Sequence, residues 1–180
     1  STGYSANLGT MAALLDESNA VLIDSEAHAS LFDGCRMSGA EVFRFKHNDP
    51  SSLERRLQRL GERANSTLII VEGLYSIRGD CAPLKEFAEL KEIYNSYLLV
   101  DEAHLCPAEM FSTALNSLNA KVKIGISATP KRKDGKHVFL GDYFSPFMVE
   151  ARDPRQLQDP VVMIKRTDVR FPVIDPKRDW

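Results

Sequence analysis

Short apolar runs that alternate with helical patterns constrain the fold of this chain more than any other feature of its sequence. The runs cover residues 20–24, 41–45, 67–73, 97–103 and 122–127. The run TLIIVEG at residues 67–73 is continuous and rich in β-branched side chains, which is typical of a strand buried on both faces. Strands that alternate with helices favour parallel pairing and right-handed crossovers. We therefore expect an α/β fold, a Rossmann-like three-layer αβα arrangement with a mainly parallel sheet and helices on both faces.

Helical patterns fill the segments between these runs, at residues 6–15, 28–37, 51–61, 83–95 and 107–118. The third pattern begins with SSLE after a proline, which predicts a serine cap and a capping box. In the fourth pattern, four apolar residues share one face, and we expect that face to pack on the sheet. These residues are Leu84, Phe87, Leu90 and Ile93.

Length and composition are those of an ordinary globular protein, with 180 residues, 43% hydrophobic and 27% charged. We expect a single α/β domain over residues 1–180, in which residues 152–180 form an irregular, strand-containing tail. The net charge of −2 gives no general attraction for nucleic acid. The three cysteines form no C-x-x-C pair, which favours reduced thiols and a cytoplasmic type of location. No apolar run reaches the roughly 18 residues of a membrane span, and the N-terminus lacks the basic start of a signal peptide, so we expect no membrane partner.

Polar side chains follow three of the predicted strands at the point where each strand ends. His28 follows AVLID, Glu72 and Ser76 follow TLIIV, and Asp101 and His104 close LLV. Because ligands of parallel α/β sheets bind at the carboxyl ends of the strands, we expect these side chains to converge on one site.

Five motifs over residues 1–104 resemble, in this order, those of the α-oxoamine synthases: STGYSANLG, HAS, FKHND, VEGLYSIRGDCAPL and VDEAH. These pyridoxal-phosphate enzymes condense an amino acid with an acyl-CoA. The resemblance implies that His28 stacks on the cofactor ring and that Asp101 pairs with the ring nitrogen, keeping it protonated so that the ring can act as an electron sink. It also implies that His104 hydrogen-bonds the phenolic oxygen and that Glu72 and Ser76 line the pocket.

The lysine that binds the cofactor covalently in that family is not recognisable here. Lys131 and Lys133, in the basic loop after residues 122–127, lie about where the family places it and are the candidates. The alternative is that they belong to a solvated basic loop. Without this lysine the usual chemistry cannot start, so we expect no bound cofactor, with pyridoxal phosphate as the alternative.

Residues 98–151 resemble superfamily 2 helicases of the DEAH, phage-related type, through VDEAHLCPAEMF, IGISATPKRKDGKH and LGDYFSPF. The resemblance implies a magnesium-type metal site at Asp101 and Glu102, with Glu102 orienting the attacking water. It also implies a coupling motif at Ser127, Ala128 and Thr129. The chain has no G-x-x-x-x-G-K-[ST] phosphate loop, so Mg-ATP is less favoured than pyridoxal phosphate. The loop cations make nucleic acid a candidate partner through phosphate contacts: Lys131, Arg132, Lys133 and Lys136.

The two resemblances meet at VDEAH, and each lacks an essential part of its family. The hypothesis we favour is an engineered or recombined chimera, truncated relative to both parent families, with no complete active site and no enzyme activity. It would serve as a test of foldability. The alternatives are a residual pyridoxal-phosphate-binding fragment of a transferase and an ATP- or DNA-binding fragment of a helicase. Exposed sheet edges or apolar faces also predict a homodimer.

Overall fold

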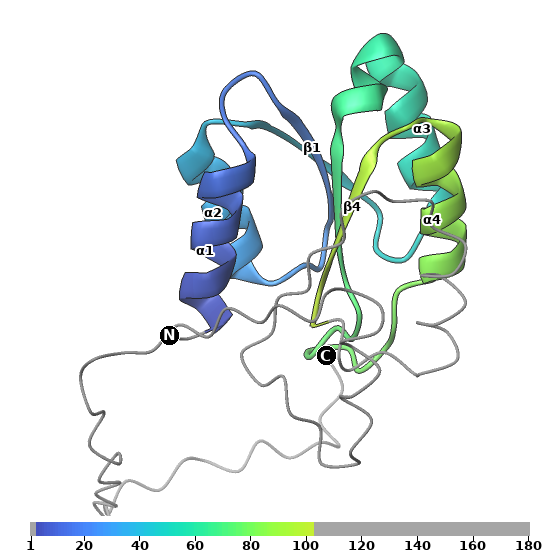
Figure 1. Ribbon diagram of the computed structural model, residues 1–180. Coiled ribbons are helices and arrows are strands. Elements are labelled where there is room, and N and C mark those ends of the chain that lie inside the picture. The colour runs from blue at the N-terminus through green and yellow to red at the C-terminus, as the bar shows by residue number, and fades with distance from the viewer. Residues whose placement is uncertain (1–2, 103–180) are drawn as a thin grey trace, which may run out of the picture.

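The computed structural model describes residues 3–102, which form a four-stranded parallel sheet between two layers of helices (Figure 1). The predicted elements at residues 107–118 and 122–127 lie outside the described residues, as does the predicted tail at residues 152–180. The described elements follow one another in this order: α1 (Gly3–Leu14), β1 (Ala20–Asp24), α2 (Ala29–Ser38), β2 (Glu41–Phe45), α3 (Pro50–Leu60), the 3₁₀ helix η1 (Gly61–Ser66), β3 (Leu68–Glu72), α4 (Leu84–Ile93) and β4 (Tyr97–Asp101).

The strands stand in the order β2-β1-β3-β4, and every neighbouring pair is parallel. All five residues of β1 and all five of β3 are buried, as their continuous apolar runs predict. The register pairs Asp24 with Phe45 and Glu72 with Asp101, so the last residues of the strands lie at one edge of the sheet. The expectation of an α/β fold with a parallel sheet is confirmed.

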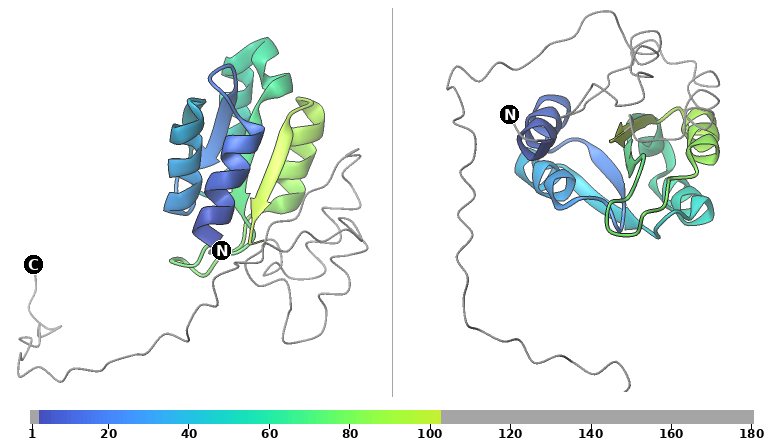
Figure 2. Two further views of the ribbon diagram at one scale, coloured as in Figure 1. Left: turned by 60° about the vertical axis from the view of Figure 1, so that its left-hand side comes forward. Right: turned by 90° about the horizontal axis from the view of Figure 1, so that it is seen from below.

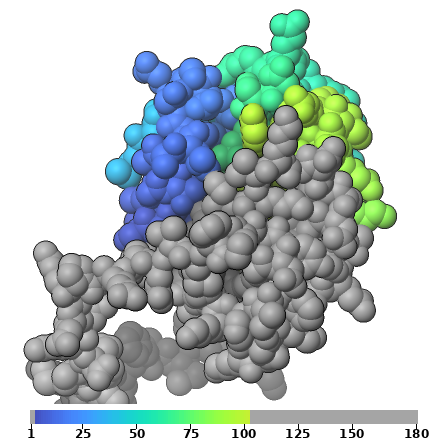
Figure 3. All heavy atoms as spheres, in the orientation of Figure 1, coloured from blue at the N-terminus to red at the C-terminus, as the bar shows by residue number. Residues whose placement is uncertain are grey.

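Two helices cover each face of the sheet, which confirms the three-layer arrangement (Figures 1 and 2). Because side chains alternate along a strand, β1 and β3 supply both cores. The core on the side of α1 and α2 includes Met11, Val21, Ile23, Leu31, Cys35 and Ile70. The core on the side of α3 and α4 includes Leu22, Leu53, Leu57, Ile69, Val71 and Phe87. The blue N-terminal residues and the yellow-green residues near β4 lie on opposite flanks of the described part in Figure 3.

Helix α3 begins at a different residue from the one that the sequence pattern predicts. The cap is Asp49, whose side-chain Oδ1 accepts a hydrogen bond from the backbone N–H of Ser52 at 2.9 Å, and Pro50 occupies the first turn. Ser51, the predicted cap, is an exposed residue inside the helix. The chain turns at Asn48, whose φ is 49°, and this turn directs the carboxylate of Asp49 at the helix N-terminus. The predicted capping box is therefore wrong.

Three of the four residues predicted to pack from α4 onto the sheet do so: Leu84, Phe87 and Leu90 are buried. Ile93 was expected beside them but is 70% exposed. Ile93 is the last residue of the helix, and Tyr94, which follows it, packs against the core instead.

Among residues 3–102, none of the helices is both long and apolar enough to cross a membrane.

Candidate functional site

The order of strands reverses between β1 and β3. From β1 the chain moves outward to β2, and it then returns to place β3 on the other side of β1. The segment after β1 leads to α2 on one face of the sheet, and the segment after β3 leads to α4 on the other (Figure 2). In doubly wound sheets ligands bind outside the carboxyl ends of the strands at this kind of reversal, where the two connections separate. The residues that follow β1 and β3 are therefore the first place to look for a site.

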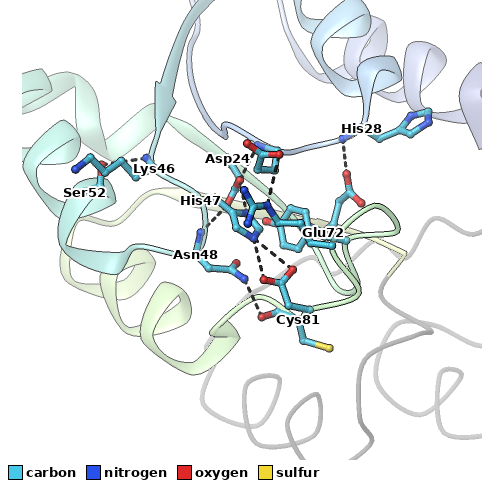
Figure 4. Close-up of polar contacts among 12 residues, drawn as sticks. Asp24, His28, Lys46, His47, Asn48, Ser52, Glu72 and Cys81 are labelled. Atoms are coloured by element: carbon cyan, nitrogen blue, oxygen red, sulfur yellow. Dashed lines mark hydrogen bonds and ion pairs between the residues drawn. The ribbon is translucent and has the colours of Figure 1, made fainter. Parts of the chain in front are cut away.

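Glu72, the last residue of β3, is 3% exposed, and its carboxylate accepts a hydrogen bond from the backbone N–H of His28 (Figure 4). Burial raises the pKa of Glu72, the His28 hydrogen bond opposes the rise, and the negative charges of Asp101, Glu102 and Asp24 add to it. The net result is a pKa of about 7. Glu72 can therefore hold or release a proton near neutral pH.

His28 is the N-cap of α2, and its ring is anchored on one side. The ring Nδ1 accepts from the backbone N–H of Ser30 at 3.2 Å and lies 2.7 Å from the Ser30 hydroxyl. The residue is exposed, and Figure 4 shows its ring pointing away from Glu72. A ring fixed in this way can present a face to a planar ligand.

Asp101, the last residue of β4, is a buried carboxylate held by two nitrogen donors. Its Oδ2 accepts from the side-chain amide of Asn7 at 2.7 Å, and its Oδ1 accepts from the backbone N–H of Glu102 at 2.9 Å. The same Asn7 nitrogen donates to the Ser30 hydroxyl at 3.0 Å. Asn7, itself 4% exposed, thus joins α1, the start of α2 and the end of β4.

The structure brings three of the predicted site residues together and leaves the others apart or undescribed. His28, Glu72 and Asp101 meet at one end of the sheet, through the His28–Glu72 bond and the contacts of Asn7 and Ser30. Ser76 is exposed on the loop after β3 and, within residues 3–102, is not hydrogen-bonded to this group. Glu102 is half-buried, with φ at 50°. The remaining predicted residues lie outside the described part: His104, Ser127, Ala128, Thr129, Lys131, Arg132, Lys133 and Lys136.

Sequence reasoning missed Asn7 and Ser30, which stand in the motifs STGYSANLG and HAS. It also missed a second polar group at the same end of the sheet, formed by Asp24, His47 and Asp80. The signal was present, because His47 and Asp80 stand in the quoted motifs FKHND and VEGLYSIRGDCAPL. No spacing within a motif indicates which distant partner such a side chain meets.

A groove of about 360 Å³ lies between β2 and α3, lined partly by Lys46 and by Arg55, Arg56 and Arg59. Its lining does not include His28, Glu72 or Asp101. The candidate site is therefore defined by its polar contacts and not by this groove. Within residues 3–102, no group of three or more His, Cys, Asp or Glu side chains could hold a metal ion. The metal pair at Asp101 and Glu102 stays a prediction.

Comparison with known proteins assigns the chain to a family. Residues 1–124 match the family model for aminotransferases of class I and II. The chain belongs to this aminotransferase family. The serine palmitoyltransferase of Caulobacter vibrioides is 52% identical over 103 residues, which are 57% of this chain and 26% of the relative. The 8-amino-7-oxononanoate synthase of Alcanivorax borkumensis is 48% identical over 104 residues, 58% of this chain and 26% of the relative.

A solved lysine-to-alanine variant of the serine palmitoyltransferase of Sphingomonas paucimobilis, with a bound aldimine of pyridoxal phosphate and myriocin, is 43% identical with a TM-score of 0.54. The match covers 57% of this chain and 25% of that one. This chain thus spans about a quarter of the length of the relatives it matches.

The aminotransferase assignment confirms one of the two predicted resemblances. The α-oxoamine synthase resemblance is confirmed, because a serine palmitoyltransferase and an 8-amino-7-oxononanoate synthase each match over more than 100 residues. The helicase resemblance of residues 98–151 receives no support. The family match continues to residue 124, well into that segment, so the interpretation of the chain as a chimera joined at VDEAH is not supported either. The expectation of no cofactor is also unsupported, since the S. paucimobilis relative is solved with an aldimine of pyridoxal phosphate.

Proposed function

We propose that this chain binds pyridoxal phosphate at the carboxyl ends of β3 and β4. We further propose that it forms part of an α-oxoamine synthase, which condenses an amino acid with an acyl-CoA. The observation that carries the proposal is Asp101, a buried carboxylate oriented by Asn7 at the end of a parallel strand. The 52% identity with a serine palmitoyltransferase gives independent support.

The contacts of Asp101 fit the nitrogen of a pyridine ring. The two oxygens of an ionised carboxylate offer about four acceptor positions, and Asn7 and the Glu102 N–H occupy one on each oxygen. Asp101 therefore has room to accept a third N–H, and its negative charge favours a protonated ring nitrogen. When bound, the cofactor supplies an electron-withdrawing ring for chemistry at the α-carbon of an amino acid.

Two further side chains have properties that suit this role. His28 would cover one face of the ring, since its residue is exposed and its imidazole is anchored through Nδ1. Glu72, with a pKa of about 7, would hold or release a proton beside Asp101. Ser76 and His104 remain proposed contacts of the cofactor. Lys131 and Lys133 remain the candidates for its covalent attachment.

Calorimetric titration of the full chain with 4′-deoxypyridoxine phosphate tests the proposal. This analogue lacks the aldehyde, so it cannot react with any lysine, and heat reports non-covalent binding alone. We expect saturable binding at one site per chain. The Asp101→Asn variant removes the negative charge but keeps the shape, and we expect it to bind at least about tenfold more weakly, because a hydrogen bond to a charged group contributes about 1.5–3 kcal/mol.

The matched control is Glu86→Gln, which makes the same chemical change at an exposed position in the first turn of α4. It should bind the analogue as the unmodified chain does. Urea unfolding of each variant verifies that it is folded. Absence of binding by the unmodified chain, or equal binding by the Asp101→Asn variant, would contradict the proposal.

A further inference from the structure

His47 lies between two carboxylates that come from distant parts of the chain. Its Nδ1 is 2.9 Å from Oδ1 of Asp24, at the end of β1 (Figure 4). Its Nε2 is 3.1 Å from Oδ2 of Asp80, in the loop between β3 and α4. The side chain of Asp24 is fully buried and that of His47 is 13% exposed, whereas that of Asp80 is 46% exposed. One ring thus connects the interior of the sheet to a surface loop.

Both ring nitrogens must donate for these contacts to be hydrogen bonds. An ionised carboxylate only accepts, and a neutral imidazole carries a single N–H. His47 therefore satisfies both partners only as the imidazolium. Burial lowers the pKa of His47, but the hydrogen bonds and charges of Asp24 and Asp80 outweigh it, and the net result is a raised pKa. The hydrogen bond from His47 in turn lowers the pKa of Asp80.

Asp80 is the last residue of a turn that begins at Tyr75, shortly after Glu72. The backbone oxygen of Asp80 accepts from the backbone N–H of Tyr75 at 2.9 Å. The backbone N–H of Gly79 donates to the backbone oxygen of Tyr75 at 2.7 Å. Tyr75 is buried, with its ring perpendicular to that of His47 at 4.5 Å, and its hydroxyl accepts from the backbone N–H of Glu72 at 3.3 Å. The turn from Tyr75 to Asp80 is thus tied at its base both to His47 and to the end of β3.

We propose that the His47 imidazolium fastens the Tyr75–Asp80 turn to the carboxyl end of β1, and that it thereby acts as a positioning residue for Glu72 and Ser76. The fastening itself depends on no ligand. Only its consequence for Glu72 and Ser76 rests on the proposed cofactor site. Ser76 lies within the turn. Glu72 lies before the turn and is separated from it by Gly73 and Leu74.

The other contacts of the loop between β3 and α4 are either exposed to solvent or uncharged, unlike the contact between His47 and Asp80. Arg78 lies 3.6 Å from Glu26, but both side chains are well exposed, and exposed pairs contribute little. The Asn48 side chain donates to the Cys81 oxygen at 3.1 Å, just beyond the turn, and carries no charge. Asp24 is held independently, because it also accepts from the backbone N–H groups of Glu26 and Asn48, each at 2.9 Å. Tyr75, the first residue of the turn, is buried and stays anchored without His47. Loss of the His47 contact should therefore release the Asp80 end of the turn and leave Asp24 in place.

The fastening should depend on pH in a defined window. The charged or titratable groups that face His47 are Asp24 from β1, and Asp80 and Tyr75 from the loop. Because the pKa of His47 is raised in the folded chain, its contribution is complete below about pH 6.5 and is lost as the pH rises through the raised value. Because the pKa of Asp80 is lowered, the contact is also lost as the pH falls below about 3.9 and passes through that lowered value.

The first experiment follows the ring of His47 by NMR during a pH titration of the full chain. We expect a titration midpoint above about 6.5 in the unmodified chain and a lower midpoint in Asp80→Asn. Glu41→Gln is the matched control. It removes a comparably exposed carboxylate from an ion pair with Arg63, at the amino end of β2 and therefore far from the carboxyl ends of the strands. It should leave the midpoint unchanged. A midpoint at or below the ordinary histidine value in the unmodified chain would overturn the fastening.

The second experiment measures how readily the turn opens. Trypsin cleaves after Arg78, whose side chain is 52% exposed within the turn, and mass spectrometry reports the fragment that ends there. At one fixed pH below the His47 midpoint, we expect Asp80→Asn and His47→Gln to be cleaved at least about threefold faster than the unmodified chain and Glu41→Gln. Hydrogen exchange at the Gly79 amide should be faster above the measured His47 midpoint than below it, after correction for the intrinsic rate. In His47→Gln this difference should vanish. Equal cleavage in all four proteins would overturn the fastening.

Affinity for 4′-deoxypyridoxine phosphate separates the fastening from the proposed function. If the turn is released in Asp80→Asn and the analogue binds several-fold more weakly, the positioning role is supported. If the turn is released and the affinity is unchanged, the positioning role is overturned and the fastening stands. If the unmodified chain binds no analogue, the proposed function fails, and the NMR and cleavage results still decide the fastening.

Discussion

Glu72 is a single buried carboxyl group whose ionisation opposes folding. Its pKa is about 7 in the folded chain against 4.5 ordinarily, so the folded state binds the proton more tightly. Stability should therefore fall as the pH rises from about 4.5 through 7, by about 3 kcal/mol, because one pKa unit corresponds to 1.36 kcal/mol. We expect Glu72→Gln to lack this loss and to be more stable than the unmodified chain at pH 8.

Urea unfolding at pH 5 and pH 8 measures the effect. Glu86→Gln, at an exposed position, should keep the pH dependence of the unmodified chain. An unchanged pH dependence in Glu72→Gln would show that another group is responsible.

Asn7 is the residue on which the geometry of Asp101 depends. Its amide donates to both Asp101 and Ser30 from a buried position. We expect Asn7→Ala to lower the free energy of unfolding by about 1–3 kcal/mol, because it leaves a buried carboxylate without its side-chain donor. Thr10→Ala is the control in the same helix, since within residues 3–102 the Thr10 hydroxyl bonds only back to the Ala6 backbone oxygen and its loss should be nearly neutral. Equal unfolding free energies for the two variants would contradict this account.

At the residue scale, the motifs indicated the ends of the interactions but not their partners. Glu72 and Asp101 could be predicted because each stands at the end of an apolar run, and His28 because it follows shortly after one, where a parallel sheet gathers its polar groups. Asn7 could not, because it lies in the middle of a helix, and its role arises from a contact with a residue 94 positions away. Such long-range pairs are set by how the helices lie on the sheet.

At the scale of one element, the start of α3 can be tested, because two different residues are candidates for its N-cap. The structure assigns the cap to Asp49, whereas the sequence pattern indicates Ser51. Replacing an N-cap residue with alanine costs about 0.5–2 kcal/mol. We expect this loss in Asp49→Ala and almost none in Ser51→Ala, as measured by urea unfolding. A larger loss in Ser51→Ala would restore the capping box.

The packing of α1 against α2 depends on a glycine. A Cβ added at Gly34 would lie 2.8 Å from Met11 Cγ and 2.9 Å from Met11 Cβ, too close for the helices to keep their places. We expect Gly34→Ala to cost about 1–3 kcal/mol, as overpacking does. A Cβ at Gly9, in α1, would meet nothing within 4 Å, so Gly9→Ala should gain about 0.5–1 kcal/mol from helix propensity. Thermal unfolding of both variants checks the opposite signs, and a shift in the same direction would contradict them.

At the scale of the whole molecule, the parallel α/β class followed from the alternation of patterns, because βαβ connections leave few other arrangements. The strand order could not be predicted in the same way. The apolar runs of β1 and β3 show that both are central, but nothing local determines that β2 lies outside β1. The interpretation of the chain as a chimera depended on short motifs, and a four-residue motif such as DEAH recurs in unrelated folds.

The predicted homodimer is tested by sedimentation velocity of the full chain. A mass near twice 20.2 kDa, independent of salt, is the expected result for association through apolar faces. Ile93 and Tyr97 are exposed apolar residues close to or within β4 and would be candidates for such a contact. A mass of one chain at all concentrations would contradict the prediction.

The strand order has a consequence for how the chain acquires its structure during synthesis. Of the four described strands, β1 and β2 are made before β3 and β4, and they can pair as soon as α2 has formed between them. The other side of β1 must wait for residues 68–70, which pair with residues 21–23. Until then the Val21–Leu22–Ile23 edge is unpaired, and an apolar edge of this kind promotes aggregation. Nascent chains halted before β3 should therefore need a chaperone, and those halted after it should not.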